Sequence, residues 1–192
     1  MKAERIESKF GIETLVFNGA KTERLFVYLH GSGEFGKGVE GQFEYPGFAT
    51  LLSDGVLEIP HPFAIACCVI GENWEKEMLS NYLKKLSARF DNPKIDLLGY
   101  SRGGEGAYRI ADSPHVNSVT VINSRLPKPY CTDTPLHVIH AVDDQITPID
   151  SVRAFSRHVE SVSKLTEWQG DHYCIEPIAR SKVWFNWIME ST

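Results

Sequence analysis

Short apolar runs alternate along the chain with longer stretches in which apolar residues recur at helical spacing. Apolar runs rich in Val, Ile and Phe and bounded by turn residues are typical of buried strands, whereas recurrence with a period near 3.6 is typical of amphipathic helices. The Asn18-Gly19 pair between the first two runs predicts a turn. The predicted strands are 12–17, 24–30, 63–70, 94–100, 116–123, 135–141 and 163–168, and the predicted helices are 74–90, 102–113, 149–160 and 176–189.

The alternation of strands and helices predicts an α/β fold, in which helices cover both faces of a mostly parallel sheet. No repeat, low-complexity segment or Pro/Ser-rich linker interrupts it, so we expect residues 1–192 to form a single domain. With 192 residues, 42% of them hydrophobic, the chain has material for one well-buried core. Ligands of such sheets bind at the carboxyl ends of the strands, so the loops that follow the strands are the first places to look for a site.

Composition and charge narrow the possible partners. The formal net charge is −5, and the Lys and Arg residues are scattered, which argues against nucleic acid and anionic membranes as partners. No apolar run approaches the roughly 18–20 residues of a membrane span, and the first residues lack the apolar core of a signal peptide, so we expect a soluble, cytoplasmic protein. Cys67 and Cys68 are neighbours on a predicted strand, and with Cys131 and Cys174 they form no Cys-x-x-Cys pair, so we predict packed thiols rather than a disulfide.

The segment Gly99-Tyr100-Ser101-Arg102-Gly103 begins its helix against the local rules, because glycines crowd the first turns. Each costs about 0.5–1 kcal/mol relative to alanine inside a helix. The pattern Gly-x-Ser-x-Gly between a strand and a helix is that of a nucleophile elbow, in which glycines leave room for a sharp turn and the serine projects above the sheet. Ser101 is therefore the predicted nucleophile. The alternative is a helix entry rich in serine and glycine that carries no chemistry.

A serine hydroxyl is a weak nucleophile, so Ser101 needs a general base and an acid that orients the base. On such an elbow these partners follow along the chain in the order serine, acid, histidine. His172 lies in the loop after the last predicted strand and is the predicted base. Asp143 and Asp144 directly follow the strand predicted at 135–141, and either one is placed to act as the acid.

A second glycine-rich loop, residues 30–38, follows the strand predicted at 24–30 and contains a formal match to the dinucleotide fingerprint G-x-G-x-x-G. That fingerprint should open an apolar helix, but glycine and proline interrupt the segment that follows, so a nicotinamide-dependent oxidoreductase is the weaker alternative. The loop suits an oxyanion hole better. The backbone N–H of Ser32, with that of Gly33 beside it, would join the N–H of Arg102.

His137, His140 and Asp143 together raise the possibility of a metal site. Residues three apart on a strand face opposite sides of the sheet, so the two histidines are not expected to bind one ion. We therefore predict no metal and no other cofactor.

These segments resemble the α/β-hydrolase family, and the resemblance covers nearly the whole chain from residue 12 onward. "LHGSGEFG", "GYSRGG", "HAVDDQITP" and "GDHY" stand in the order of the family. "LHGSGE" with "GYSRGG" is similar to small esterases and predicted peptidases related to polyester depolymerases and dienelactone hydrolases. The acid segment of the family, H-G-x-x-D-x-x-V-P, selects Asp144 when it is laid on His140 and Pro148. Ala141 and Thr147 depart from that pattern, which leaves Asp143 open.

The resemblance implies acyl transfer in two steps. Ser101 attacks a carbonyl while His172, oriented by Asp144, takes its proton, and the N–H groups of Ser32 and Arg102 hold the oxyanion. Water then releases the acyl group. The expected substrate is a small or acyl-bearing ester. Thioesterase and peptidase activities share this chemistry, and a catalytically silent binding protein of the same fold is the remaining alternative.

The connection at 124–134 is short, which predicts no helical lid and an open pocket that favours short acyl groups or a bulky partner. Gly33, Tyr100 and Arg125 are predicted to contact the substrate. Arg102 and Arg125, near the carboxyl ends of strands, are candidates for attracting an anionic substrate, and the alternative is that each is solvated or structurally paired.

Three aromatic residues near the second glycine-rich loop, Phe35, Phe43 and Tyr45, are candidates either for a pocket wall or for the core. Glu34 lies in the same loop and is a candidate for a structural anchor, but the sequence does not fix its role.

Overall fold

The computed structural model describes residues 2–7, 10–19, 22–126, 133–158 and 162–191. The strands are β1 (Ala3–Glu7), β2 (Ile12–Phe17), β3 (Arg24–Leu29), β4 (Phe63–Ile70), β5 (Lys94–Tyr100), β6 (Val116–Ile122), β7 (Leu136–Ala141) and β8 (Val162–Trp168). They form one 8-stranded sheet in the order β1-β2-β4-β3-β5-β6-β7-β8. β2 is antiparallel to both of its neighbours, and the other pairings are parallel, so the prediction of a mostly parallel sheet is confirmed.

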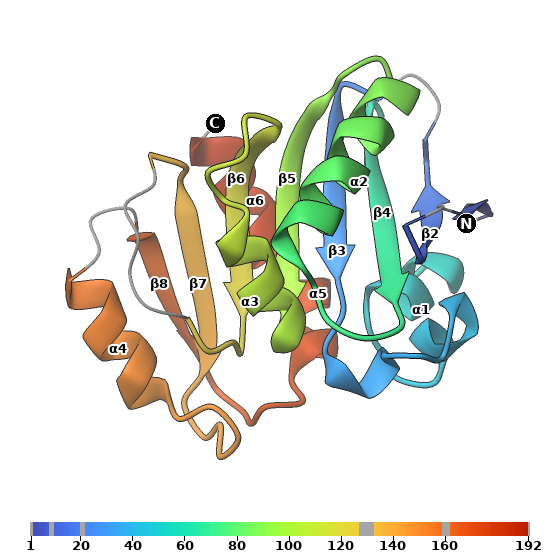
Figure 1. Cartoon of the computed structure of the whole chain (residues 1–192). Coiled ribbons are helices and arrows are strands. Elements are labelled where there is room, and N and C mark those ends of the chain that lie inside the picture. The colour runs from blue at the N-terminus through green and yellow to red at the C-terminus, as the bar shows by residue number, and fades with distance from the viewer. Residues whose placement is uncertain (1, 8–9, 20–21, 127–132, 159–161, 192) are drawn as a thin grey trace.

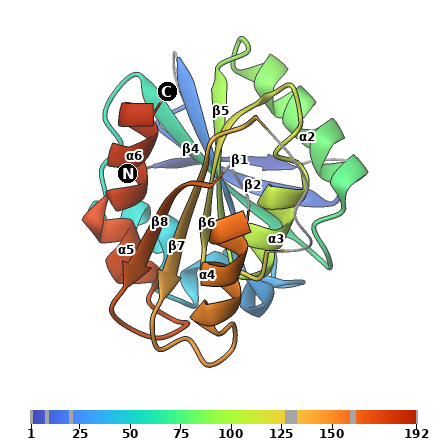
Figure 2. The same ribbon diagram turned by 90° about the vertical axis from the view of Figure 1, so that its left-hand side faces the viewer.

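Helices cover both faces of the sheet, as predicted (Figures 1 and 2). They are α1 (Phe48–Ser53), α2 (Lys76–Arg89), α3 (Arg102–Arg109), α4 (Ile149–His158), α5 (Ile175–Ser181) and α6 (Val183–Ser191), with the short 3-10 helices η1 (Ser32–Glu34) and η2 (Val39–Phe43). α2, α3 and α4 pack on one face, and α1, α5 and α6 pack on the other.

The apolar runs read as strands are buried on both sides because successive side chains of a strand point to opposite faces. In β3, Leu25, Val27 and Leu29 pack toward α2 and α3, whereas Phe26 and Tyr28 pack toward α1 and α6. Alternation along one strand therefore supplies side chains to two separate cores. It also carries Tyr28 to the face on which α1 lies.

One prediction of local structure was wrong, and two elements were not predicted. The helix predicted at 176–189 is two helices, α5 and α6, because Lys182 between them adopts a left-handed backbone conformation with φ 54°. β1 was not predicted because its sequence, AERIE, is mostly charged and forms an exposed edge strand. α1 was not predicted because its six residues directly follow a segment rich in glycine and proline.

The cysteine prediction is confirmed for the residues that the structure describes. Cys67, Cys68 and Cys174 are buried free thiols, and Cys67 and Cys68 lie in the cores on opposite faces of the sheet. Cys131 lies outside the described residues. Within the described ranges, no helix combines the length and the hydropathy needed to cross a membrane.

The connection predicted to lack a lid is described at its two ends, 124–126 and 133–134, and its middle lies outside the described residues. No large lid is present in the part of the chain that the structure describes.

Candidate active site

The sheet brings the loops of five neighbouring strands to one edge. Because β3, β5, β6, β7 and β8 are parallel and adjacent, their carboxyl ends lie together. The register pairs Leu29 with Gly99, Tyr100 with Ile122, and Ala141 with Trp168. Residues that follow these strands are therefore neighbours in space although the chain separates them widely.

Ser101 occupies the turn between β5 and α3. Its backbone has φ 52° and ψ −118°, a region that non-glycine residues rarely adopt and that marks a strained turn. The turn needs its glycines. A Cβ on Gly103 would lie 2.0 Å from the carbonyl oxygen of Leu29, and one on Gly99 would lie 2.4 Å from that of Gly103. The elbow thus packs backbone against backbone, which is the role predicted for both glycines.

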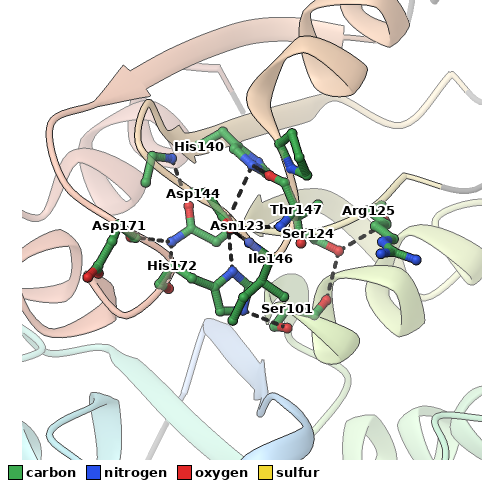
Figure 3. A network of polar contacts seen from close by, with 12 residues as sticks. Ser101, Asn123, Ser124, Arg125, His140, Asp144, Ile146, Thr147, Asp171 and His172 are labelled. Carbon is green, nitrogen blue, oxygen red and sulfur yellow. Dashed lines mark hydrogen bonds and ion pairs between the residues drawn. The ribbon is translucent and has the colours of Figure 1, made fainter.

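Ser101 lies next to an imidazole that is itself held by a carboxylate (Figure 3). The Nε2 of His172 lies 3.1 Å from the Oγ of Ser101, and its Nδ1 lies 2.7 Å from Oδ2 of Asp144. Because Nδ1 faces a carboxylate, we assign the ring proton to Nδ1. Nε2 is then free to accept the hydrogen of the Ser101 hydroxyl.

The carboxylate that faces His172 belongs to Asp144. Asp144 is 3% exposed, and its second oxygen accepts hydrogen bonds from the backbone N–H groups of Ile146, at 2.9 Å, and Thr147, at 2.7 Å. Asp143 is exposed to solvent. Of the two aspartates that the sequence left open, the structure therefore brings Asp144 to the histidine.

His140 lies behind Asp144. Its Nε2 lies 2.6 Å from the carbonyl oxygen of Thr147 and 3.5 Å from Oδ2 of Asp144. Burial lowers the pKa of His140 below its ordinary value. His140 therefore adds a hydrogen-bond donor to this corner of the site, and its burial disfavours the charged form of the ring.

Two side chains that sequence reasoning did not assign to this task hold the backbone of His172. Its carbonyl oxygen accepts hydrogen bonds from the hydroxyl of Tyr100 and from Nδ2 of Asn123, each at 2.8 Å. Asn123 also accepts the N–H of Ala141, so it ties the end of β7 to the His172 loop. The only signal in the sequence was a polar residue at the carboxyl end of an apolar strand. Tyr100, which we predicted to contact substrate, thus holds the backbone of His172.

The loop after β3 is fixed beside the elbow by His30. The Nδ1 of His30 lies 2.6 Å from the carbonyl oxygen of Gly31, and its Nε2 accepts the N–H of Ile70. Burial lowers the pKa of His30 to about 4, so the ring is neutral. A Cβ on Gly31 would lie 3.3 Å from that of Ser101, which shows how closely the loop approaches the serine.

A cavity of about 410 Å³ opens beside Ser101 and His172. Ser32, Gly33 and Tyr100, for which the sequence predicts roles in the oxyanion hole or in substrate contact, line this cavity. The rest of its wall is mainly aromatic and apolar. Further lining residues are Tyr28, Glu34, Gln42, Tyr45, Pro46, Gly47, Phe48, Ala49, Ile146, Tyr173 and Ile175.

Of the three aromatic residues considered for the pocket wall, only Tyr45 lines this cavity. Phe35 packs against His30 and Trp74, with ring centroids 5.0 and 6.4 Å away. Phe43 is 45% exposed.

Neither arginine considered for anion binding brings its side chain to the cavity. The guanidinium of Arg102 donates to Asn73 at 2.8 Å and lies 3.4 Å from a carboxylate oxygen of Glu105. Arg125 is not among the described residues that line the cavity. Its carbonyl oxygen accepts a hydrogen bond from the hydroxyl of Ser124, at 3.0 Å (Figure 3). Arg102 is therefore structurally paired, the alternative that the sequence left open.

The histidines of β7 point to opposite faces of the sheet, as predicted. His137 packs on Trp187 of α6, whereas His140 reaches Thr147 and Asp144. Within the described part of the chain, no cluster of three or more His, Cys, Asp or Glu side chains is arranged to hold a metal ion.

Comparison with solved structures identifies the fold. The chain is similar to an alpha-beta serine hydrolase homologue from Coxiella burnetii, with a TM-score of 0.68 and 16% identity over 96% of each chain. It is also similar to a thermostable esterase, with a TM-score of 0.69 and 18% identity, and here the match covers 98% of this chain but 62% of the esterase. The chain has the α/β-hydrolase fold.

No family model matches the sequence, and no curated protein matches it. At these identities the structural likeness establishes the fold, so the chemistry has to be argued from the site itself.

Proposed function

We propose that this protein is a serine hydrolase that cleaves carboxylic esters. The observation that carries the proposal is the continuous hydrogen-bonded series from Ser101 through His172 to Asp144, placed on a strained elbow at the mouth of a cavity. A nucleophile, a base and an orienting acid in this geometry define acyl-transfer chemistry whatever the fold. The esterase among the structural neighbours supports an ester as the substrate.

In the first step, His172 takes the proton of Ser101 as the serine oxygen attacks the carbonyl carbon. Asp144 keeps the imidazole in the required tautomer and stabilises the imidazolium that forms. The backbone N–H groups of Ser32 and Arg102 stabilise the oxyanion. Both residues begin helices, η1 and α3, and the first N–H groups of a helix have no acceptor within it.

Collapse of the tetrahedral intermediate transfers the proton from His172 to the leaving alcohol and leaves an acyl group on Ser101. Water then attacks this ester with His172 again as the base, which releases the acid and restores the serine. Tyr100 and Asn123 keep His172 in place through both steps, because they bind its backbone and leave the ring nitrogens free.

Labelling with a fluorophosphonate, read by intact mass, tests the nucleophile without a known substrate. We expect one adduct on the parent protein, none on Ser101→Ala, and slow labelling of His172→Ala. Asp144→Asn should lower the rate of ester hydrolysis by about 10⁴-fold, because the imidazole loses the acceptor that fixes its tautomer. Asp143→Asn is the matched control, since it makes the same change at an exposed neighbour.

A folded parent protein that stays unlabelled would contradict the proposal and favour a silent binding protein of the same fold. Equal loss of activity in Asp143→Asn and Asp144→Asn would contradict the assigned acid. Matched esters, thioesters and peptides then separate the activities that this chemistry allows, and we expect the ester to give the highest kcat/KM.

A further inference from the structure

Glu34 places a carboxyl group in the wall of the cavity without a basic side chain to neutralise it. Its side chain is 13% exposed, and it lines the cavity together with Ser101 and His172. Among the described residues its one ion-pair contact is with Nδ1 of His30, at 3.9 Å, which is too long for a hydrogen bond. A largely buried carboxylate is costly unless it is paired with a cation, so we ask which cation pairs with Glu34.

His30 does not supply that positive charge. Its Nε2 accepts the N–H of Ile70, so the ring proton lies on Nδ1, which donates to the carbonyl oxygen of Gly31. The low pKa of His30 keeps the ring neutral at ordinary pH. The imidazole is therefore fully used in holding the loop.

Lys37 acts on Glu34 only through space: its charge opposes the effect of burial on the pKa of Glu34, but its ammonium group is paired elsewhere. It is the nearest lysine along the chain, but its ammonium group is bound to Glu44 and lies over the ring of Tyr45. Among the described residues that line the cavity there is no lysine or arginine. Burial accordingly raises the pKa of Glu34 to about 7, a value at which a cationic ligand would readily bind to its ionised form.

The remainder of the wall suits a cation as well. Five aromatic residues line the cavity, and the negatively polarised faces of aromatic rings attract ammonium groups. Burial raises the pKa of the phenols of Tyr28 and Tyr100, and the charge of the nearby Glu34 raises both further. The ring of Tyr28 lies 4.7 Å from that of Phe48, which continues the aromatic wall. A carboxylate set among aromatic rings is the chemistry that recognises an organic cation.

We propose that this cavity binds an organic ammonium group of the substrate, with Glu34 as its counter-ion, so that the protein prefers esters that carry a cationic nitrogen. The inference rests on the proposed ester hydrolysis at Ser101 and adds the substrate class. It also replaces the anionic substrate considered from the sequence, because Arg102 and Arg125 lie outside the cavity and Glu34 lies inside it.

Pairs of isosteric esters test the proposal. The first pair is acetylcholine and 3,3-dimethylbutyl acetate, in which a tert-butyl group replaces the trimethylammonium group. The second pair is a nitrophenyl ester of a trimethylammonio acid and its tert-butyl isostere. The two pairs place the charge on opposite sides of the scissile bond. We expect the parent to favour the cationic member of at least one pair by about tenfold in kcat/KM, the value of a partly desolvated cation–π and ion-pair contact.

Glu34→Gln should reduce that preference about tenfold, because the amide keeps the shape of the side chain and removes the charge. Glu58→Gln removes the same charge at an exposed position outside the cavity and should leave the preference unchanged. A parent without cationic preference, or a preference that persists in Glu34→Gln, would overturn the proposal.

Binding measured without turnover separates this proposal from the proposed activity. Calorimetry on Ser101→Ala should give a lower Kd for the cationic ester than for its isostere, and the difference should disappear in Ser101→Ala/Glu34→Gln. Cationic preference in binding without fluorophosphonate labelling of the parent would leave the ammonium site standing and remove the hydrolase. Labelling of the parent without cationic preference would support the hydrolase and overturn the ammonium site.

Discussion

Glu34 shows how a single residue can make the stability of a protein depend on pH. Burial raises the pKa of its carboxyl to about 7 in the folded protein, whereas the unfolded chain releases the same proton at lower pH. The folded state therefore binds more protons than the unfolded state between these two values. It follows that the free energy of unfolding falls as pH rises through this window, from the pKa of the unfolded chain to that of the folded protein.

Glu34→Gln should remove this dependence, because the amide has no proton to release. We expect the variant to be more stable than the parent by about 2–3 kcal/mol at about pH 8, and nearly equal to it at about pH 4, where both states of the parent keep the proton. Urea unfolding at both pH values measures the difference, with Glu58→Gln as the control for a simple change of charge. A variant that is less stable than the parent at both pH values would show that the carboxyl itself holds the loop together.

At the scale of the element, the approach of α3 to the sheet sets the position of Ser101. A Cβ on Gly103 would meet the backbone of β3 at Leu29, which cannot move without disturbing the sheet. Gly103→Ala should therefore lower the free energy of unfolding by about 3 kcal/mol or more, at the upper end of the costs of overpacking. The melting temperature and the rate of fluorophosphonate labelling should fall together, since Ser101 directly precedes α3.

Gly71→Ala is the matched control for Gly103→Ala. A Cβ on Gly71 would meet no atom within 4 Å. This variant should melt close to the parent and label at the same rate. Equal effects of the two substitutions would mean that glycine content, rather than contact between α3 and β3, is what matters at the elbow.

The elements predicted from the sequence are those whose conformation can be recognised from their own residues, without knowledge of what they pair with. β3, β5, β6 and β7 are buried on both faces and mainly apolar, so their burial is visible in the sequence. β1 is charged, and its strand conformation comes from pairing with β2, which no local signal reveals. Likewise, the break at Lys182 separates two stretches that share one helical period.

The same distinction holds in the site. Ser101, Asp144 and His172 could be proposed from the sequence because each follows a strand and their order along the chain is informative. The structure shows their proximity, and labelling will test their roles. Asn123 and Glu34 could not be assigned, because what defines them is a neighbour far away in the chain: the backbone of His172 for one, and a cavity wall without a cation for the other.

At the scale of the whole molecule, helix α6 packs against residues that form a wall of the cavity. Trp184 of α6 is fully buried, and its ring packs edge-on against Phe26 and Phe48, each at 5.3 Å. Phe48 of α1 in turn lines the cavity beside Tyr28. A residue near the end of the chain thus fixes a wall that is built from residues near its beginning. Trp187, one turn further along α6, packs on the ring of His137, which is not among the described residues that line the cavity.

This arrangement predicts that both tryptophans of α6 contribute to stability but that only Trp184 affects the preference for acyl-chain length. Trp184→Leu and Trp187→Leu should each lower the free energy of unfolding by about 2–4 kcal/mol, because each leaves a void in the core. Only Trp184→Leu should also let Phe48 move back and enlarge the cavity, so only this variant should hydrolyse longer acyl chains better relative to acetate. Melting curves and kcat/KM for a series of acyl lengths measure both effects. Equal shifts in chain-length preference would mean that loss of core packing in general, and not the contact between Trp184 and Phe48, controls the cavity.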